Sequence, residues 1–269
     1  MSESEDTGAR LRALYAVDGG PQAAFSTKVA DYDASRPDYP AALFATLAAE
    51  ASLAAGATVA DVGAGTGLLT HGLLQRGWQV IAVEPNREMR LAADRRLGPT
   101  AGYRSVDGSA EAMPLASSSA DLITAAQAFH WFDIERARTE FLRVLKPAGP
   151  VALIWNDRVP EDPLNEALDA MSERFGGARR QALVAHAEGR NVARFFGMGT
   201  VRQFLWPHAH RLDEARFLAL VFSRSYIPAR DTPAGREVAG LVQEIFRRFA
   251  SDDAVEVRYR TVAVLGRPA

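Results

Sequence analysis

The fold is indicated most strongly by Thr58–Gly67, which reads TVADVGAGTG. Its first half, Thr58–Val62, is apolar and β-branched, which favours a buried strand. Three glycines follow at alternate positions, and glycine permits positive φ angles and close approach of a ligand to the backbone. Amides at the start of the next helix can hydrogen-bond a polar ligand. The stretch therefore predicts a strand, a glycine turn and a helix, with a ligand at the turn.

Strand-like and helix-like segments alternate around this turn, as in parallel sheets built from right-handed crossover units. The predicted strands are Thr58–Val62, Gln79–Val83, Tyr103–Val106, Asp121–Ala125, Val151–Trp155, Val201–Trp206 and Val255–Leu265. The predicted helices are Leu68–Arg76, Glu88–Leu97, Ile134–Leu145, Asp162–Gly189, Asp213–Phe222 and Thr232–Phe249. We therefore expect an α/β fold with a doubly wound, mostly parallel sheet.

Composition excludes several classes of protein. The chain has no cysteine, which removes disulfides, thiolate metal sites and cysteine nucleophiles. Its 31 basic and 33 acidic residues give a net charge of −2, which disfavours a nucleic-acid partner. Residues 1–9 do not read as a secretory signal, and the most apolar stretch, Ala41–Ala60, is too polar to cross a membrane. We expect a cytoplasmic protein without a membrane partner or a metal.

An acidic residue after the second strand points to a ribose-containing ligand. Glu84 directly follows the predicted strand Gln79–Val83, at a position where a carboxylate can hold both ribose hydroxyls. The glycine spacing opposes a dinucleotide, since Leu68 stands where the third glycine of G-x-G-x-x-G belongs. Asp61 adds a negative charge that would repel a pyrophosphate but not a cationic ligand.

Four motifs resemble, in order and spacing, those of class I S-adenosylmethionine-dependent methyltransferases. They are Asp61–Gly67, Glu84–Asn86, Gly108–Pro114 and Arg143–Gly149. Phe25–Pro40 and Ala128–Phe132 are similar to segments of the small-molecule branch that includes trans-aconitate methyltransferase. The resemblance implies a seven-stranded, Rossmann-like methyltransferase sheet, six strands parallel and the last antiparallel, with helical cap elements.

The resemblance also implies which residues bind S-adenosylmethionine. Gly63, Ala64 and Gly65 would contact its methionine part, and Glu84 its ribose. The residues expected near the adenosine and adenine are Pro85, Asn86, Met89, Ser109, Ala110 and Glu111. Ser109 departs from the pattern, because many relatives carry aspartate there.

Three further residues follow the strand Asp121–Ala125, at the sheet edge where ligands gather. Ala126 and Gln127 come first and are expected to touch the cofactor. His130 is the candidate catalytic residue, because an imidazole titrates near neutral pH and can act as a general base or bind the acceptor. A structural role in an aromatic cluster is equally compatible with its neighbours.

The segment Phe25–Pro40 is predicted to be a helix entering a turn, with Tyr32 and Arg36 four residues apart on one face. We expect the segment to close over the cofactor and the pair to meet its carboxylate, since a guanidinium suits a planar anion. The alternative is a packing tyrosine and a surface arginine.

We therefore expect one domain, with residues 1–40 as an N-terminal cap segment and 41–156 as the cofactor-binding core. Residues 157–269 would add cap helices and the last two strands. The expected activity is methyl transfer from S-adenosylmethionine to oxygen, nitrogen or carbon of a small-molecule acceptor. The alternatives are a fold relative that binds the cofactor for another reaction, a nicotinamide-dependent oxidoreductase and a scaffold protein. The sequence leaves the acceptor and the oligomeric state open.

Overall fold

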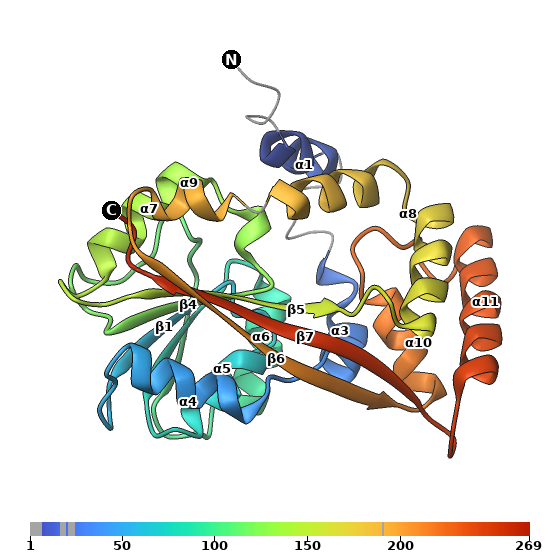
Figure 1. Cartoon of the computed structure of the whole chain (residues 1–269), viewed down its shortest axis with the longest axis horizontal. Helices are drawn as coiled ribbons and strands as arrows, with labels where there is room; N and C mark the ends of the chain where they lie inside the picture. The colour runs from blue at the N-terminus through green and yellow to red at the C-terminus, as the bar shows by residue number, and fades with distance from the viewer. Residues whose placement is uncertain (1–6, 17–19, 21–24, 190) are drawn as a thin grey trace. The chain divides into compact units, whose positions relative to one another are not determined.

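A seven-stranded sheet organises the chain, with the strand order β3-β2-β1-β4-β5-β7-β6 (Figure 1). The structure is a computed structural model that describes residues 7–16, 20, 25–189 and 191–269. The strands are β1 (Thr58–Val62), β2 (Gln79–Val83), β3 (Tyr103–Val106), β4 (Leu122–Ala126), β5 (Val151–Arg158), β6 (Val201–Leu212) and β7 (Val255–Gly266). The helices are α1 (Thr7–Ala16), α3 (Val29–Ser35), α4 (Ala41–Glu50), α5 (Leu68–Leu74), α6 (Arg87–Leu97), η2 (Phe129–Trp131), α7 (Ile134–Val144), α8 (Pro163–Gly189), α9 (Val192–Phe196), α10 (Glu214–Phe222) and α11 (Pro233–Phe249). The predicted α/β sheet with seven strands is confirmed.

The strand order reverses beside β1, which pairs in parallel with both β2 and β4. β3 pairs in parallel with β2, and β5 with β4. In open parallel sheets, ligands bind at the carboxyl ends of the strands next to such a reversal. The glycine turn after β1 therefore lies at the edge of the sheet that is suited to a ligand.

The chain divides into two compact units. Unit 1 comprises residues 1–37, 157–189 and 207–260, and unit 2 comprises residues 38–156, 190–206 and 261–269. Of the predicted cap segment 1–40, residues 1–6, 17–19 and 21–24 lie outside the described part. Residues 190–206 and 261–269 belong to the same unit as 38–156, so the C-terminal third contributes to both units.

In unit 2 the helices cover both faces of the sheet, as Figure 1 shows. α4, α5 and α6 bury Leu43, Leu73 and Leu97 against one face. α7 and α9 bury Phe141 and Phe195 against the other face. Apolar strand residues fill both layers, which explains why these strands read as near-continuous apolar runs in the sequence. Burial of both faces fixes the register and so positions the loops at the strand ends.

Unit 1 has a core of its own, built from α8, α10, α11 and the first half of β7. Phe217 of α10 and Val238 and Val242 of α11 are fully buried in it. Along β7 buried and exposed residues alternate from Val255 to Arg260, as the sequence predicts. The helices of unit 1 and the first half of β7 therefore pack around an apolar core that belongs to this unit alone.

Two strands are longer than predicted. β5 continues from Trp155 to Arg158, and β6 continues from Trp206 to Leu212. β6 contains Pro207, which lacks a backbone N–H, and the strand order places β6 at the edge of the sheet. An edge strand tolerates proline because one side of it needs no partner. Pro207 therefore does not end the strand β6.

A buried carboxylate joins three elements of unit 2. Asp61 of β1 is 1% exposed, and its two oxygens accept hydrogen bonds from Thr70 Oγ1 of α5 at 2.6 Å and Thr124 Oγ1 of β4 at 2.8 Å. Burial raises the pKa of Asp61 to about 6, although both hydroxyl groups lower it. The carboxylate thus holds the first turn of α5 against the central strands.

The raised pKa of Asp61 predicts a pH-dependent stability. The folded protein binds this proton more tightly than the unfolded chain, so the contribution of Asp61 to stability is largest at low pH and is lost as the pH rises through about 6. The loss should amount to about 2–3 kcal/mol between pH 4 and pH 7. Asp61→Asn should remove this slope, as measured by urea unfolding at several pH values.

Asp121→Asn is the matched control. Asp121 accepts hydrogen bonds from Lys146 Nζ and Thr58 N, and these bonds keep the pKa of its carboxyl below the ordinary value even though its partial burial raises it. Because its pKa is lowered, the contribution of Asp121 to stability is lost only in acid, so between about pH 5 and pH 7 the unfolding free energy of this variant should change with pH as that of the unmodified protein does, apart from a constant offset. Parallel curves for Asp61→Asn would instead show that Asp61 does not titrate in this range.

Candidate functional site

The three glycines of the turn after β1 are required for different structural reasons. All have positive φ, 68° at Gly63, 59° at Gly65 and 80° at Gly67. A Cβ on Gly63 would lie 2.5 Å from the Cβ of Ala128, and one on Gly67 would lie 2.6 Å from Leu97 Cδ1. A Cβ on Gly65 would meet no atom within 4 Å. Gly63 and Gly67 are therefore needed for packing, whereas Gly65 faces open space in which a ligand can approach the backbone.

Glu84 connects this turn to the end of β2. Its Oε2 accepts the Gly65 N–H and its Oε1 accepts the Asn86 N–H, both at 2.8 Å. The residue is 8% exposed, and burial raises the pKa of its carboxyl, while the two backbone hydrogen bonds lower it. A carboxylate offers about four lone-pair sites, so two remain for hydroxyl donors of a ligand.

The residues after Glu84 form the start of α6. Asn86 Oδ1 accepts the Met89 N–H at 2.9 Å and so caps the helix, which leaves the Asn86 side chain committed to structure. Met89 is 4% exposed, and Pro85 is half-buried. The helix start thus holds Glu84 in place.

Arg90 is a positioning residue that the sequence reasoning did not single out. Its Nη1 donates to the Glu84 carbonyl at 2.6 Å, and its Nη2 donates to Asp107 Oδ2 at 3.0 Å. It therefore links the carboxyl ends of β2 and β3. Its place on the first turn of α6, six residues after Glu84, is the signal that could have indicated it.

The segment after β3 forms a tight turn. Ser109 and Ala112 exchange backbone hydrogen bonds of 3.3 and 3.2 Å, and Ala110 between them is 3% exposed. Glu111 Oε1 accepts the Asp133 N–H at 2.8 Å, so its carboxylate secures the start of α7. The adenine-binding role of Ser109, Ala110 and Glu111 stays a prediction.

Gln127, directly after Ala126 and the end of β4, has a φ of 55°, which non-glycine residues adopt rarely. Its backbone N–H donates to the Ile154 carbonyl at 2.9 Å, and its Nε2 donates to the Asn156 carbonyl at 3.1 Å. Such strained positions cluster at functional sites. Both strand ends, β4 and β5, are therefore fixed beside the glycine turn.

Asn156 is a second residue that the sequence reasoning passed over. It is 8% exposed, its Nδ2 donates to the Asp38 carbonyl, and its Oδ1 accepts the hydroxyl of Thr261 at 2.6 Å. A lone amide at the end of the apolar run Val151–Trp155 is the sequence signal for it. It joins β5, β7 and the segment before α4.

His130 lies in the short helix η2 and is half-buried. Its ring is 4.7 Å from the ring of Trp131, at an angle of 50°. Phe129 and Phe132 on either side are buried in the core, and their rings are 5.9 Å apart. The aromatic cluster thus exists and carries His130 close to the end of β4, while its catalytic role stays a prediction.

Tyr32 and Arg36 belong to unit 1. The Arg36 guanidinium lies 4.8 Å from the centre of the Tyr32 ring, and Arg36 Nε donates to Ser223 Oγ at 2.9 Å. Lys28 Nζ donates to the carbonyls of Phe222 and Ile227, so the residues around α3 are held by the polypeptide after α10. Arg36 follows the last residue of α3 in extended backbone, and its guanidinium still lies over the Tyr32 ring. Binding of a cofactor carboxylate by the pair stays a prediction.

The residues at the strand ends of unit 2 fit an adenosine-containing cofactor. Gly65 provides the open cradle, and Glu84 provides a buried carboxylate beside it. Among the described residues, no three or more His, Asp or Glu side chains gather as metal ligands would. No helix in that part of the chain is long and apolar enough to cross a membrane.

Comparison with known proteins identifies the family. A family profile described as a methyltransferase domain matches residues 60–153. An uncharacterized methyltransferase-like protein of Schizosaccharomyces pombe is 31% identical over 245 residues, which cover 89% of this chain and 93% of the relative. An uncharacterized methyltransferase of Mycobacterium tuberculosis is 31% identical over 247 residues, with the same two coverages of 89% and 93%.

The fold is also shared with solved structures. A candidate type II methyltransferase from Anaeromyxobacter dehalogenans aligns with a TM-score of 0.57 and 24% identity, and covers 86% of this chain and 96% of that chain. A candidate methyltransferase of an antibiotic biosynthesis pathway from Anabaena variabilis aligns with a TM-score of 0.56 and 20% identity, covering 86% of this chain and 98% of that chain. Since its relatives match over nearly their whole length and its glycine turn and strand order fit the same fold, the chain belongs to the S-adenosylmethionine-dependent methyltransferases.

Proposed function

We propose that the protein transfers the methyl group of S-adenosylmethionine to an oxygen, nitrogen or carbon atom of a small molecule. The observation that carries this proposal is the open turn at Gly65, whose amide is held by the buried carboxylate of Glu84. A net charge of −2 supports a small acceptor over a nucleic acid. The resemblance of Phe25–Pro40 and Ala128–Phe132 to the branch that includes trans-aconitate methyltransferase supports the same choice.

The strand ends of unit 2 would hold the cofactor. Backbone groups of Gly63, Ala64 and Gly65 would bind its methionine part, and the free lone pairs of Glu84 would accept its ribose hydroxyls. The remaining binding residues that we propose are Tyr32, Arg36, Pro85, Asn86, Met89, Ser109, Ala110, Glu111, Ala126 and Gln127. Asp61, which is already bonded to two threonines, would act through the shape of the turn and through its charge.

The bound cofactor supplies a methyl group that is already activated by a sulfonium. The protein residues then have to align the acceptor with that methyl group and exclude water. The strand ends, held by hydrogen bonds of Glu84, Arg90 and Asn156, would provide this alignment. His130 would bind the acceptor or remove its proton where the acceptor is a neutral acid.

The acceptor class can be tested directly with the purified protein. Methyl-labelled S-adenosylmethionine should be incubated with the protein and with cell extract separated by size into small molecules and macromolecules. We expect label to enter the small-molecule fraction only. Transfer of label to the protein or nucleic-acid fraction alone would contradict the proposed acceptor class, and boiled enzyme is the control.

Glu84→Ala should weaken binding of demethylated cofactor by about 1–3 kcal/mol, the scale for losing hydrogen bonds to a charged group. Glu84→Gln should lose less, because its carbonyl oxygen can still accept one hydrogen bond. Affinity is measured by titration calorimetry. Glu88→Gln is the control, since this glutamate is exposed on α6 and its replacement makes the same change in charge. Equal affinity in all variants would remove Glu84 from the site.

His130→Ala and His130→Gln separate the roles of this histidine. If His130 is a general base, both variants should lose about 10²–10⁴-fold in kcat, and the pH profile should lose its limb near neutrality. If it donates a hydrogen bond, Gln should retain most of the activity that Ala loses. Full turnover of both variants would leave His130 as part of the aromatic wall only.

A further inference from the structure

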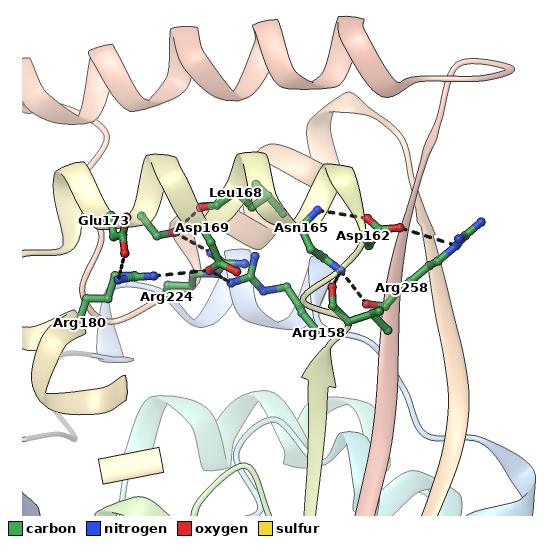
Figure 2. A network of polar contacts seen from close by, with 11 residues as sticks. Arg158, Asp162, Asn165, Leu168, Asp169, Glu173, Arg180, Arg224 and Arg258 are labelled. Carbon is green, nitrogen blue, oxygen red and sulfur yellow. Dashed lines mark hydrogen bonds and ion pairs between the residues drawn. The ribbon is translucent and has the colours of Figure 1, made fainter. Parts of the chain in front are cut away.

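Unit 1 contains a group of arginines that the proposed reaction does not use. Figure 2 shows Arg158, from the end of β5, and Arg180, from α8, beside Asp169, with Arg224 next to them after α10. Arg224 is 7% exposed, and the side chains of Arg158 and Arg180 are 18% and 15% exposed. Arginine is seldom buried unless it is paired, so the partners of these guanidinium groups decide what the cluster can do.

This cluster contains fewer carboxylates than guanidinium groups. Arg158 Nη2 and Arg180 Nη2 share one oxygen of Asp169, whose side chain is 41% exposed. Arg224 Nη1 donates to the hydroxyl of Ser172 at 3.0 Å, and within the described part of the chain no carboxylate pairs with Arg224. The cluster thus holds one buried and two half-buried guanidinium groups, while its carboxylates are Asp169 and the exposed Glu173, which contacts Arg180.

One nitrogen of the cluster is left without any hydrogen bond. Arg158 Nη1 is buried and has no partner among the residues that the structure describes. An unsatisfied buried donor on a charged group is costly, because its lost hydration is not replaced. The fork of a guanidinium matches two oxygens of a carboxylate or a phosphate group. A carboxylate or phosphate group could therefore accept a hydrogen bond from the free nitrogen of Arg158 and also balance the charge of Arg224.

Two tyrosines of unit 1 interact electrostatically with these arginines, Tyr226, which is half-buried, and Tyr259, which is buried. Burial raises the pKa of Tyr226, but the guanidinium groups of Arg224 and Arg158 lower it more, and the net pKa is below the usual value. Burial also lowers the pKa of Arg158, and repulsion from Arg224 lowers it further. Burial keeps the pKa of Tyr259 above the usual value, although Arg224, Arg36 and Arg158 lower it.

We propose that Arg158 and Arg224 form a binding site for a small anion, through its carboxylate or phosphate group. The anion would accept from Arg158 Nη1 and would neutralise Arg224, while Ser172 and Tyr226 stand beside it as hydroxyl groups. The inference uses residues of unit 1 only and does not rest on the proposed methyl transfer. Failure of either one would leave the other standing.

The test is titration of the full chain with malonate and, separately, with inorganic phosphate, at constant ionic strength set with chloride. We expect saturable binding of one anion per chain for at least one probe, and the better probe identifies the preferred group. Arg224→Gln should weaken this binding by about tenfold or more, the scale for losing a charge-assisted hydrogen bond. Circular dichroism and the unfolding midpoint without anion check that the variant is folded.

Arg174→Gln is the matched control, because this arginine lies on α8 but is 60% exposed and paired with Glu237. Its affinity should stay within about twofold of the unmodified protein. Arg158→Lys keeps the charge but loses the Nη1 fork, should also weaken binding, and decides the matter if Arg224→Gln does not fold. Absence of saturable binding for both probes, or equal weakening by Arg174→Gln and Arg224→Gln, would overturn the proposal.

Discussion

The hydrogen bonds of Glu84 are the constraint on which the candidate site depends. One carboxylate accepts the backbone N–H groups of Gly65 and Asn86, and these residues follow two neighbouring strands. Two turns that could each take other conformations are thereby fixed in one. The same group is buried close to the charge of Asp61, which raises the pKa of Glu84 further. The turn is thus organised by charge as well as by glycine.

Much of unit 2 could be predicted because its signals are local. A strand buried on both faces shows as an apolar run, and a turn with positive φ shows as glycine, so Thr58–Gly67 already indicates strand, turn and helix. The ribose-binding role of Glu84 was predicted from its place at the end of β2. The hydrogen bonds of Glu84 to Gly65 and Asn86 could not be predicted, because they depend on the register between β1 and β2. Arg90 and Asn156 were missed for the same reason.

Unit 1 could be predicted only as a set of elements. Helices α8, α10 and α11 follow from their composition, but their partners are distant in the sequence. Arg158 and Asp169 meet because β5 runs past its apolar end, and Arg224 reaches Ser172 across 52 residues. No spacing rule links such residues. The chain is also rich in arginine, and the sequence does not distinguish the arginines of this cluster from exposed ones.

The buried carboxylates of unit 2 and the arginine cluster of unit 1 differ in how far the fold satisfies their charge. In unit 2 the carboxylates of Asp61 and Glu84 are surrounded by donors of the protein itself, two hydroxyls for one and two amides for the other. In the arginine cluster of unit 1 three guanidinium groups have two carboxylate partners, Asp169 and Glu173, and Arg158 Nη1 has no partner among the described residues. A buried charge that the fold does not satisfy lowers stability, so its retention favours a role outside the fold. The carboxylates are therefore held by the fold itself, with lone pairs of Glu84 left for a ligand, whereas the free nitrogen of Arg158 is what an anion from solution would satisfy.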